Sequence, residues 1–143
     1  YGRRGRNFLL TMQRLADAGR ELRVVDDQIG VPNWSRELAR ATARVVAAGL
    51  PALVERRGLY HLSARGRTTW FGFAKAILAD RPDVRLAPIT TADYPTLARR
   101  PAWSVLGTGR FEQTFGFALP DWGASLGECL TSPVAPTRDN VGG

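Results

Sequence analysis

The stretch GLYHLSARGRTTWFGFAKAIL, residues 58–78, carries the strongest fold signal in the chain. Its first five residues form a compact apolar pattern typical of a β-strand that is buried on both faces. Thr68 or Thr69 then caps a helix in which large apolar residues recur at helical spacing from Trp70 to Leu78. A strand followed by a helix is a building unit of α/β proteins, and we expect this one to lie in the core.

Further elements are predicted on both sides of this unit. Apolar spacing, caps and stop residues predict helices over residues 7–18 and 35–48, after Thr108 and after Asp121, and strands at 22–25 and 84–89. Residues 90–105 are interrupted by prolines and lack periodicity, which is typical of a functional loop. Residues 131–143 are rich in Pro, Gly, Ser and Thr, and we expect a flexible tail there. The fold class predicted is α/β.

Composition narrows the class of protein. The chain has 143 residues with 44% hydrophobic and 23% charged side chains, values that fit one globular domain and exclude a collagen-like or disordered chain. One Cys and one His cannot form a structural zinc site. No apolar run approaches the roughly 20 residues that a spanning helix needs. We expect a cytoplasmic protein without a membrane partner.

Positive charge dominates, with 20 Lys and Arg against 13 Asp and Glu and a net charge of +7. Arg36, Arg40 and Arg44 form a helical stripe, interpreted as a solvated face or as a contact for nucleic acid. Arg99 and Arg100 lie in the irregular loop and form the better candidate for a phosphate clamp, because guanidinium groups bind phosphate oxygens bidentately.

Other polar and aromatic residues give weaker signals. Gln28 follows a predicted strand end, where ligand-facing polar groups are common in α/β proteins, although a hydrated turn fits equally. Trp34 and Trp103 lie in predicted loops, where an indole can stack on a base or sugar. His61, in the middle of a predicted strand, is interpreted as a packed structural residue, with a ligand contact as the alternative. No Gly-rich phosphate loop is present, since the nearest pattern, Gly107 and Gly109, has no third glycine.

An ordered set of short motifs resembles the C-terminal half of the dTDP-4-dehydrorhamnose reductase family, over residues 1–130. The residues that carry the likeness are Asn7-Phe8, LRVVDDQIGVP at 22–32, GLYHL at 58–62, Thr69-Trp70-Phe71, Ala98-Arg-Arg-Pro101 and LPDW at 119–122.

The resemblance implies the C-terminal part of an extended short-chain dehydrogenase/reductase, which has an NAD(P)-binding Rossmann-like fold, with the N-terminal Rossmann core missing. Residues 58–79 would supply one strand and one helix that return to the Rossmann sheet. The family reduces dTDP-4-dehydro-6-deoxy-L-mannose to dTDP-L-rhamnose. NADPH or NADH would be bound by the missing half, and no catalytic residue is expected here, because no tyrosine of this chain has a lysine four residues later.

Carried over to this chain, the resemblance implies a binding cleft for a dTDP-sugar lined by Asn7, Phe8, Gln28, Pro32, Arg99, Arg100 and Trp103. Trp103 stands where the family often has Asn, which leaves the details of the pocket open. Two other functions stay open: a related reductase or epimerase acting on another nucleotide sugar, and a basic module that binds nucleic acid. A chain without its partner half is also expected to be marginally stable or to self-associate.

Overall fold

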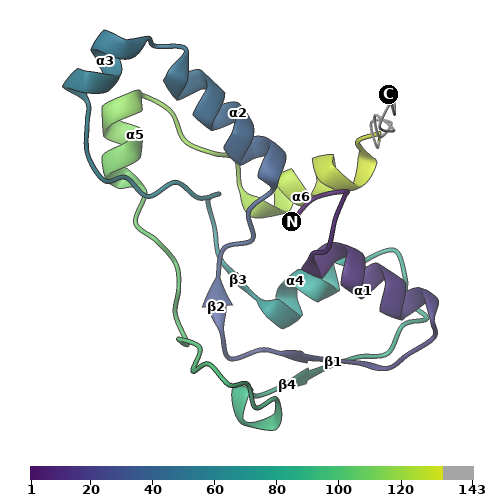
Figure 1. The fold of residues 1–143 in the computed structure, drawn as a ribbon. Coiled ribbons are helices and arrows are strands. Elements are labelled where there is room, and N and C mark those ends of the chain that lie inside the picture. The colour runs from purple at the N-terminus through teal and green to yellow at the C-terminus, as the bar shows by residue number, and fades with distance from the viewer. Residues whose placement is uncertain (134–143) are drawn as a thin grey trace, which may run out of the picture.

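The structure is a computed structural model that describes residues 1–133 (Figure 1). Its helices are α1 (Phe8–Asp17), α2 (Ser35–Val46), α3 (Leu50–Glu55), α4 (Trp70–Ile77), the 3-10 turn η1 (Thr91–Asp93), α5 (Gly109–Phe115) and α6 (Trp122–Thr131). Its strands are β1 (Leu22–Val25), β2 (Ile29–Gly30), β3 (Thr68–Thr69) and β4 (Leu86–Ile89). Mixed short strands and helices confirm the predicted α/β class.

Two small sheets organise the molecule. β1 and β4 pair in parallel, with Leu22 opposite Leu86 and Val25 opposite Ile89. Figure 1 shows α1 and α4 on one side of this pair, and both helices contact β1. β2 and β3 pair antiparallel through Ile29 and Thr69, and β3 leads directly into α4. The second sheet lies between the β1–β4 layer and the helices α2, α3 and α5 (Figure 1).

Three of the helix starts carry the caps expected from the sequence. The side chain of Asn7 accepts a hydrogen bond from the backbone N–H of Leu10, and that of Thr69 accepts one from Gly72. Asp121 accepts from the N–H of Gly123 at 2.7 Å. Each cap satisfies a backbone donor that has no partner within its helix, which explains why these helices begin where the sequence predicts.

Aromatic packing builds the core around Phe73, which is 2% exposed. Its ring lies within 5.1 to 6.1 Å of the rings of Tyr1, Phe8 and Trp122, which come from three separate segments. The predicted burial of the helix over residues 70–77 is thus confirmed at Phe73, Ala74 and Ile77. Trp70, at the start of that helix, stays 46% exposed.

The strand predicted at residues 58–62 is not formed within the described residues, and the return of this segment with α4 to a Rossmann sheet stays a prediction. Leu59 is 76% exposed and His61 is also exposed, which corrects the interpretation of His61 as a packed residue. A buried parallel strand needs a hydrogen-bonded neighbour, and residues 1–133 supply none for this segment. Within this segment, Tyr60 packs against Phe111 and Phe115.

The sequence also missed α3, which begins one residue after Gly49 and carries Pro51 in its first turn. Gly49 has φ +82°, a left-handed conformation that glycine adopts without strain. It therefore turns the chain between two helices instead of ending helical structure. α6 ends at Thr131, the first residue of the predicted tail, and residues 134–143 of that tail lie outside the described part. No helix within residues 1–133 is both long and apolar enough to span a bilayer.

Candidate functional site

A cavity of about 300 Å³ lies where β2, β3 and the start of α4 meet the segment 100–104. The segment is held against β2 by backbone bonds, from the Ile29 N–H to the Ala102 carbonyl at 2.8 Å and from the Ser104 N–H to the Ile29 carbonyl at 2.9 Å. These bonds turn part of the irregular loop into a fixed wall. The lining residues are Gln28, Ile29, Gly30, Val31, Pro32, Thr68, Thr69, Trp70, Phe73, Arg100, Pro101 and Ser104.

Glycine at position 30 permits this close approach. A Cβ atom there would lie 2.9 Å from Oγ of Ser104, and that hydroxyl donates to the Ile29 carbonyl at 3.1 Å. A larger residue at this position would force the Ser104 hydroxyl or its loop to shift. The GVP sequence at 30–32 therefore shapes the cavity wall through backbone geometry.

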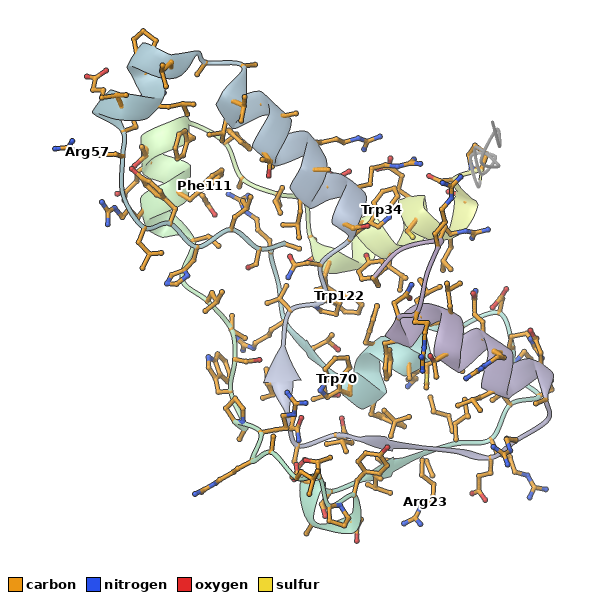
Figure 2. The ribbon with its side chains drawn as sticks, viewed as in Figure 1. Arg23, Trp34, Arg57, Trp70, Phe111 and Trp122 are labelled. Atoms are coloured by element: carbon orange, nitrogen blue, oxygen red, sulfur yellow. The ribbon has the colours of Figure 1, made fainter. Side chains whose placement is uncertain are left out.

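A second, larger cavity of about 940 Å³ lies beside the first, between α1, β1 and residues 94–100. Gln28, Trp70 and Arg100 line both cavities, so these three side chains mark the place where the two meet. Figure 2 shows Trp70 at the start of α4, beside β2 and β3. The indole packs against Phe8 with a ring separation of 4.9 Å, which holds it at the rim.

Arg100 brings positive charge to this junction. No salt bridge formed within residues 1–133 involves its guanidinium group, whereas Arg40, Arg65 and Arg81 all pair with carboxylates there. Its side chain is exposed and can meet an anion without first breaking an ion pair. An aromatic ring, an amide and an unpaired guanidinium side by side suit a ligand that has a ring, polar groups and phosphate.

The predicted site residues fall into two groups. Gln28, Pro32 and Arg100 line the smaller cavity, and Phe8 lines the larger one. Outside both lie Asn7, Arg99 and Trp103. Variants of Asn7 and Arg99 test the ligand contacts predicted for them, and the contact of Trp103 stays a prediction.

Asn7 and Trp103 have structural contacts of their own. Asn7 caps α1, and its Nδ2 donates to the carbonyls of Gly2 and Arg4, each at 3.0 Å. Trp103 pairs with Ile29 in an isolated bridge, and the guanidinium of Arg67 lies 5.5 Å from its ring centre.

A hydrogen-bonded group of three residues supports one wall. The Thr91 hydroxyl donates to Oδ1 of Asp27 at 2.6 Å, and the amide Nε2 of Gln28 donates to the Thr91 hydroxyl at 3.0 Å. Hydrogen bonds from the side chain and backbone of Thr91 lower the pKa of Asp27 from its usual range. Asp27 therefore remains a carboxylate at neutral pH.

The arginine stripe on α2 is occupied by contacts within the protein. Arg40 pairs with Glu37 at 2.6 Å and with Glu128 at 3.1 Å. Arg36 lies over the ring of Trp34 at 5.0 Å, and Arg44 lies over Phe117 at 4.1 Å. Trp34 is only 3% exposed, so it is a core residue and not the exposed loop aromatic that its position suggested (Figure 2). The stripe thus covers aromatic surface, which weakens its interpretation as a nucleic-acid contact.

The lining residues that sequence reasoning missed include the polar Thr68, Thr69 and Ser104 and the aromatic Trp70. The two threonines and Trp70 were interpreted only as a helix start. A short extended segment directly before a helix N-terminus is a frequent ligand position in α/β folds, and that signal could have found them. Ser104 carries no local signal, because it reaches the cavity only through the pairing of its loop with β2.

Within residues 1–133, no turn between a strand and a helix has the glycines of a dinucleotide-binding motif. β1 runs into Asp26 and Asp27, and β3 runs into α4 through adjacent threonines, whereas a dinucleotide-binding turn needs glycines between strand and helix. The residues present do not fit that cofactor.

Comparison with known proteins identifies the relatives of the chain. A family model described as the RmlD substrate binding domain matches residues 1–134. The dTDP-4-dehydrorhamnose reductase of Burkholderia thailandensis is 41% identical over 142 residues, covering 91% of this chain and 48% of the relative. The enzyme of the same name from Escherichia coli K12 is 40% identical over 144 residues, covering 96% of this chain and 48% of the relative. The chain thus spans about half the length of these curated relatives.

Solved structures agree with the sequence matches. The dTDP-4-dehydrorhamnose reductase of Bacillus anthracis, solved in complex with NADP, has a TM-score of 0.80 and 32% identity, covering 91% of this chain and 44% of that one. The enzyme from Clostridium acetobutylicum has the same TM-score with 35% identity and the same coverage. These structures confirm the α/β class and the expected match to only part of the larger fold.

Proposed function

The chain belongs to the RmlD substrate-binding domain family, and on that premise we propose that it binds the nucleotide sugar of a dTDP-4-dehydrorhamnose reductase. The ligand would be dTDP-4-dehydro-6-deoxy-L-mannose or its reduced product dTDP-L-rhamnose. The observation that carries the proposal is the meeting of Gln28, Trp70 and Arg100 at the junction of two cavities.

Each of these side chains suits one part of such a ligand. Arg100 would donate paired hydrogen bonds to diphosphate oxygens, the contact that its planar guanidinium favours. Trp70 offers an indole that Phe8 supports at 4.9 Å, so a sugar or base can pack on it without the ring having to be ordered first. Gln28 offers an amide that can recognise hydroxyl or imide groups.

Reduction of the sugar would need groups that residues 1–133 do not supply. The relatives are named as reductases, and one was solved with NADP. We propose that the hydride donor, NADPH or NADH, is held by another part of the complete enzyme, and that this chain orients the sugar toward it. The chain alone is expected to bind the nucleotide sugar without converting it.

Isothermal titration calorimetry of the chain with dTDP-L-rhamnose tests the proposal. Two adjacent arginines give a matched pair of variants, because Arg100 lines both cavities and Arg99 lines neither. Arg100→Ala is expected to weaken binding about tenfold or more, the usual effect of losing a charge-assisted hydrogen bond. Arg99→Ala is expected to change it less than about threefold, since solvent screens a charge outside the cavity.

The result that would overturn the proposal is the absence of binding by a sample whose circular dichroism and cooperative thermal unfolding show that it is folded. Titration with UDP-glucose separates the related alternative. Tighter binding of UDP-glucose than of dTDP-L-rhamnose would assign the chain to a different nucleotide-sugar enzyme.

A further inference from the structure

We propose that Asp27 and Thr91 act together as a positioning pair that fixes the side-chain amide of Gln28, so that its carbonyl oxygen Oε1 is presented to the ligand. Gln28 would then offer Oε1 to the ligand as a hydrogen-bond acceptor, while one of the two Nε2 protons is held by Thr91. The inference rests on the proposed function, because it specifies how that site reads its ligand.

The fold brings the three residues together. Asp27 and Gln28 follow the carboxyl end of β1, and Thr91 follows the carboxyl end of β4. Because β1 and β4 are parallel and in register at Val25 and Ile89, their two exits lie at the same edge. The backbone N–H of Thr91 donates to Oδ1 and Oδ2 of Asp27 at 3.0 and 2.9 Å, which holds the carboxylate in one place.

The direction of each hydrogen bond follows from counting protons. The Thr91 hydroxyl has one proton, and a carboxylate can only accept, so that proton lies in the 2.6 Å bond to Asp27. The hydroxyl oxygen can then only accept from Gln28, which lies 3.0 Å away through its amide. The atom of Gln28 that faces Thr91 is therefore the nitrogen Nε2, and this settles the orientation of the amide.

The amide oxygen is left for the ligand. Within residues 1–133, no donor forms a hydrogen bond with Oε1 of Gln28, although the residue lines both cavities. The lowered pKa of Asp27 supports the same arrangement, because the aspartate keeps its negative charge well below neutral pH. A ligand that fits must bring an N–H or O–H group to this point. A dTDP-sugar has two kinds, the imide N–H of thymine and the hydroxyls of the sugar.

Variants of Thr91 test the pair through calorimetry with dTDP-L-rhamnose. Thr91→Val keeps the branched shape but removes the hydroxyl, which lets the Gln28 amide turn, and we expect binding to weaken about three- to tenfold. Thr91→Ser keeps the hydroxyl and is expected to bind within about twofold of the unaltered chain. Thr42→Val removes a hydroxyl from α2, far along the chain, and serves as the control.

A double-mutant cycle separates positioning from a general structural effect. In a chain that already carries Gln28→Met, Thr91→Val should weaken binding no further, because its effect passes through Gln28. Asp27→Ala should also weaken binding only while Gln28 is present. Its loss frees the hydroxyl proton of Thr91 to form a hydrogen bond with Oε1. Equal losses from Thr91→Val with and without Gln28 would overturn the inference, as would an unchanged affinity of the single variant.

A measurement on the unaltered chain covers the case in which the variants unfold. A cross-peak in nuclear Overhauser spectra between the Gln28 Hε2 protons and the Thr91 methyl group is expected, and its absence would show the opposite amide orientation and overturn the inference.

Titration with dTDP shows which ligand group donates to Oε1 of Gln28. If Thr91→Val weakens dTDP as much as dTDP-L-rhamnose, Oε1 meets thymine; if only the sugar nucleotide is affected, it meets the sugar. Failure of the unaltered chain to bind dTDP-L-rhamnose would overturn the proposed function itself, whereas normal binding by Thr91→Val would overturn only the positioning role.

Discussion

A variant of Asn7 can distinguish a structural role from a ligand-binding role, because the two roles predict different effects on stability and on affinity. Its Oδ1 accepts from the Leu10 N–H at 3.2 Å, and its Nδ2 donates to the Gly2 and Arg4 carbonyls at 3.0 Å. Replacing Asn7 with Ala removes all three bonds and leaves the first turn of α1 without its cap. We predict that Asn7→Ala destabilises the chain while leaving ligand affinity nearly unchanged.

The magnitude follows from those three bonds. A side-chain cap contributes about 1 kcal/mol to stability, and each of the two amide–carbonyl bonds contributes about 0.5 kcal/mol when partly exposed. The expected loss is therefore about 2 kcal/mol. With an unfolding entropy of roughly 2.1 cal/mol/K per residue, a chain of 143 residues loses about 3 °C of Tm per kcal/mol, so Tm should fall by about 7 °C.

Differential scanning calorimetry measures the fall, and two variants control it. Asn7→Asp keeps the cap acceptor and loses the two donors, so it should recover about half of the lost stability. Gln13→Ala changes a residue in the middle of α1 that has no cap role and should alter Tm by less than about 2 °C. A stable Asn7→Ala chain that no longer binds dTDP-L-rhamnose would contradict this prediction and make Asn7 a ligand contact.

Three further predictions concern stability. Gly66 has φ +80°, and a Cβ there would collide with Oδ2 of Asp121, the residue that caps α6. Gly66→Ala should lower the free energy of unfolding measured in urea by about 2–3 kcal/mol. Gly127→Ala, in open space within α6, should not lower it. Thr69→Ala removes the cap of α4 and the bond to Asp26. It should lower the free energy of unfolding measured in urea by about 1–2 kcal/mol, and Thr69→Ser should restore most of this loss. Acid should also unfold the chain, because Asp27, Asp93 and Glu112 have pKa values lowered by their hydrogen bonds. Their contribution is fully present above the unfolded-state pKa of about 4 and is lost as pH falls through the lower folded-state values, so urea midpoints should be constant from pH 7 to 5 and fall below pH 4. A midpoint that rises on acidification would contradict these shifts.

Local signals in the sequence were enough to predict most helices and both strands of the parallel pair. Asn7, Thr69 and Asp121 each act within their own helix turn, so their cap roles follow from neighbouring residues alone. The strand at Leu22–Val25 could also be predicted from its own residues, because its alternating pattern indicates which side chains are buried. The strand predicted at residues 58–62 does not form because a strand needs hydrogen bonds to neighbouring strands, and the described residues supply none for this segment.

The candidate site was predictable only in part for a related reason. Gln28 and Arg100 have side-chain chemistry that identifies them as candidates wherever they lie. Ser104 and the threonines of β3 enter the cavity through pairings between segments that are distant in sequence. Arg99 and Arg100 look equivalent in the sequence, and only the backbone path beside β2 places Arg100 on the cavity.

We propose that a nucleotide sugar binds where Gln28, Trp70 and Arg100 meet. This binding site can be tested by following amide and indole chemical-shift changes in NMR spectra of the chain during titration with dTDP-L-rhamnose. We expect saturable changes concentrated at residues 28–32, 68–70 and 100–104. Changes centred instead on Arg36, Arg40 and Arg44 of α2, or no changes in a folded sample, would contradict it.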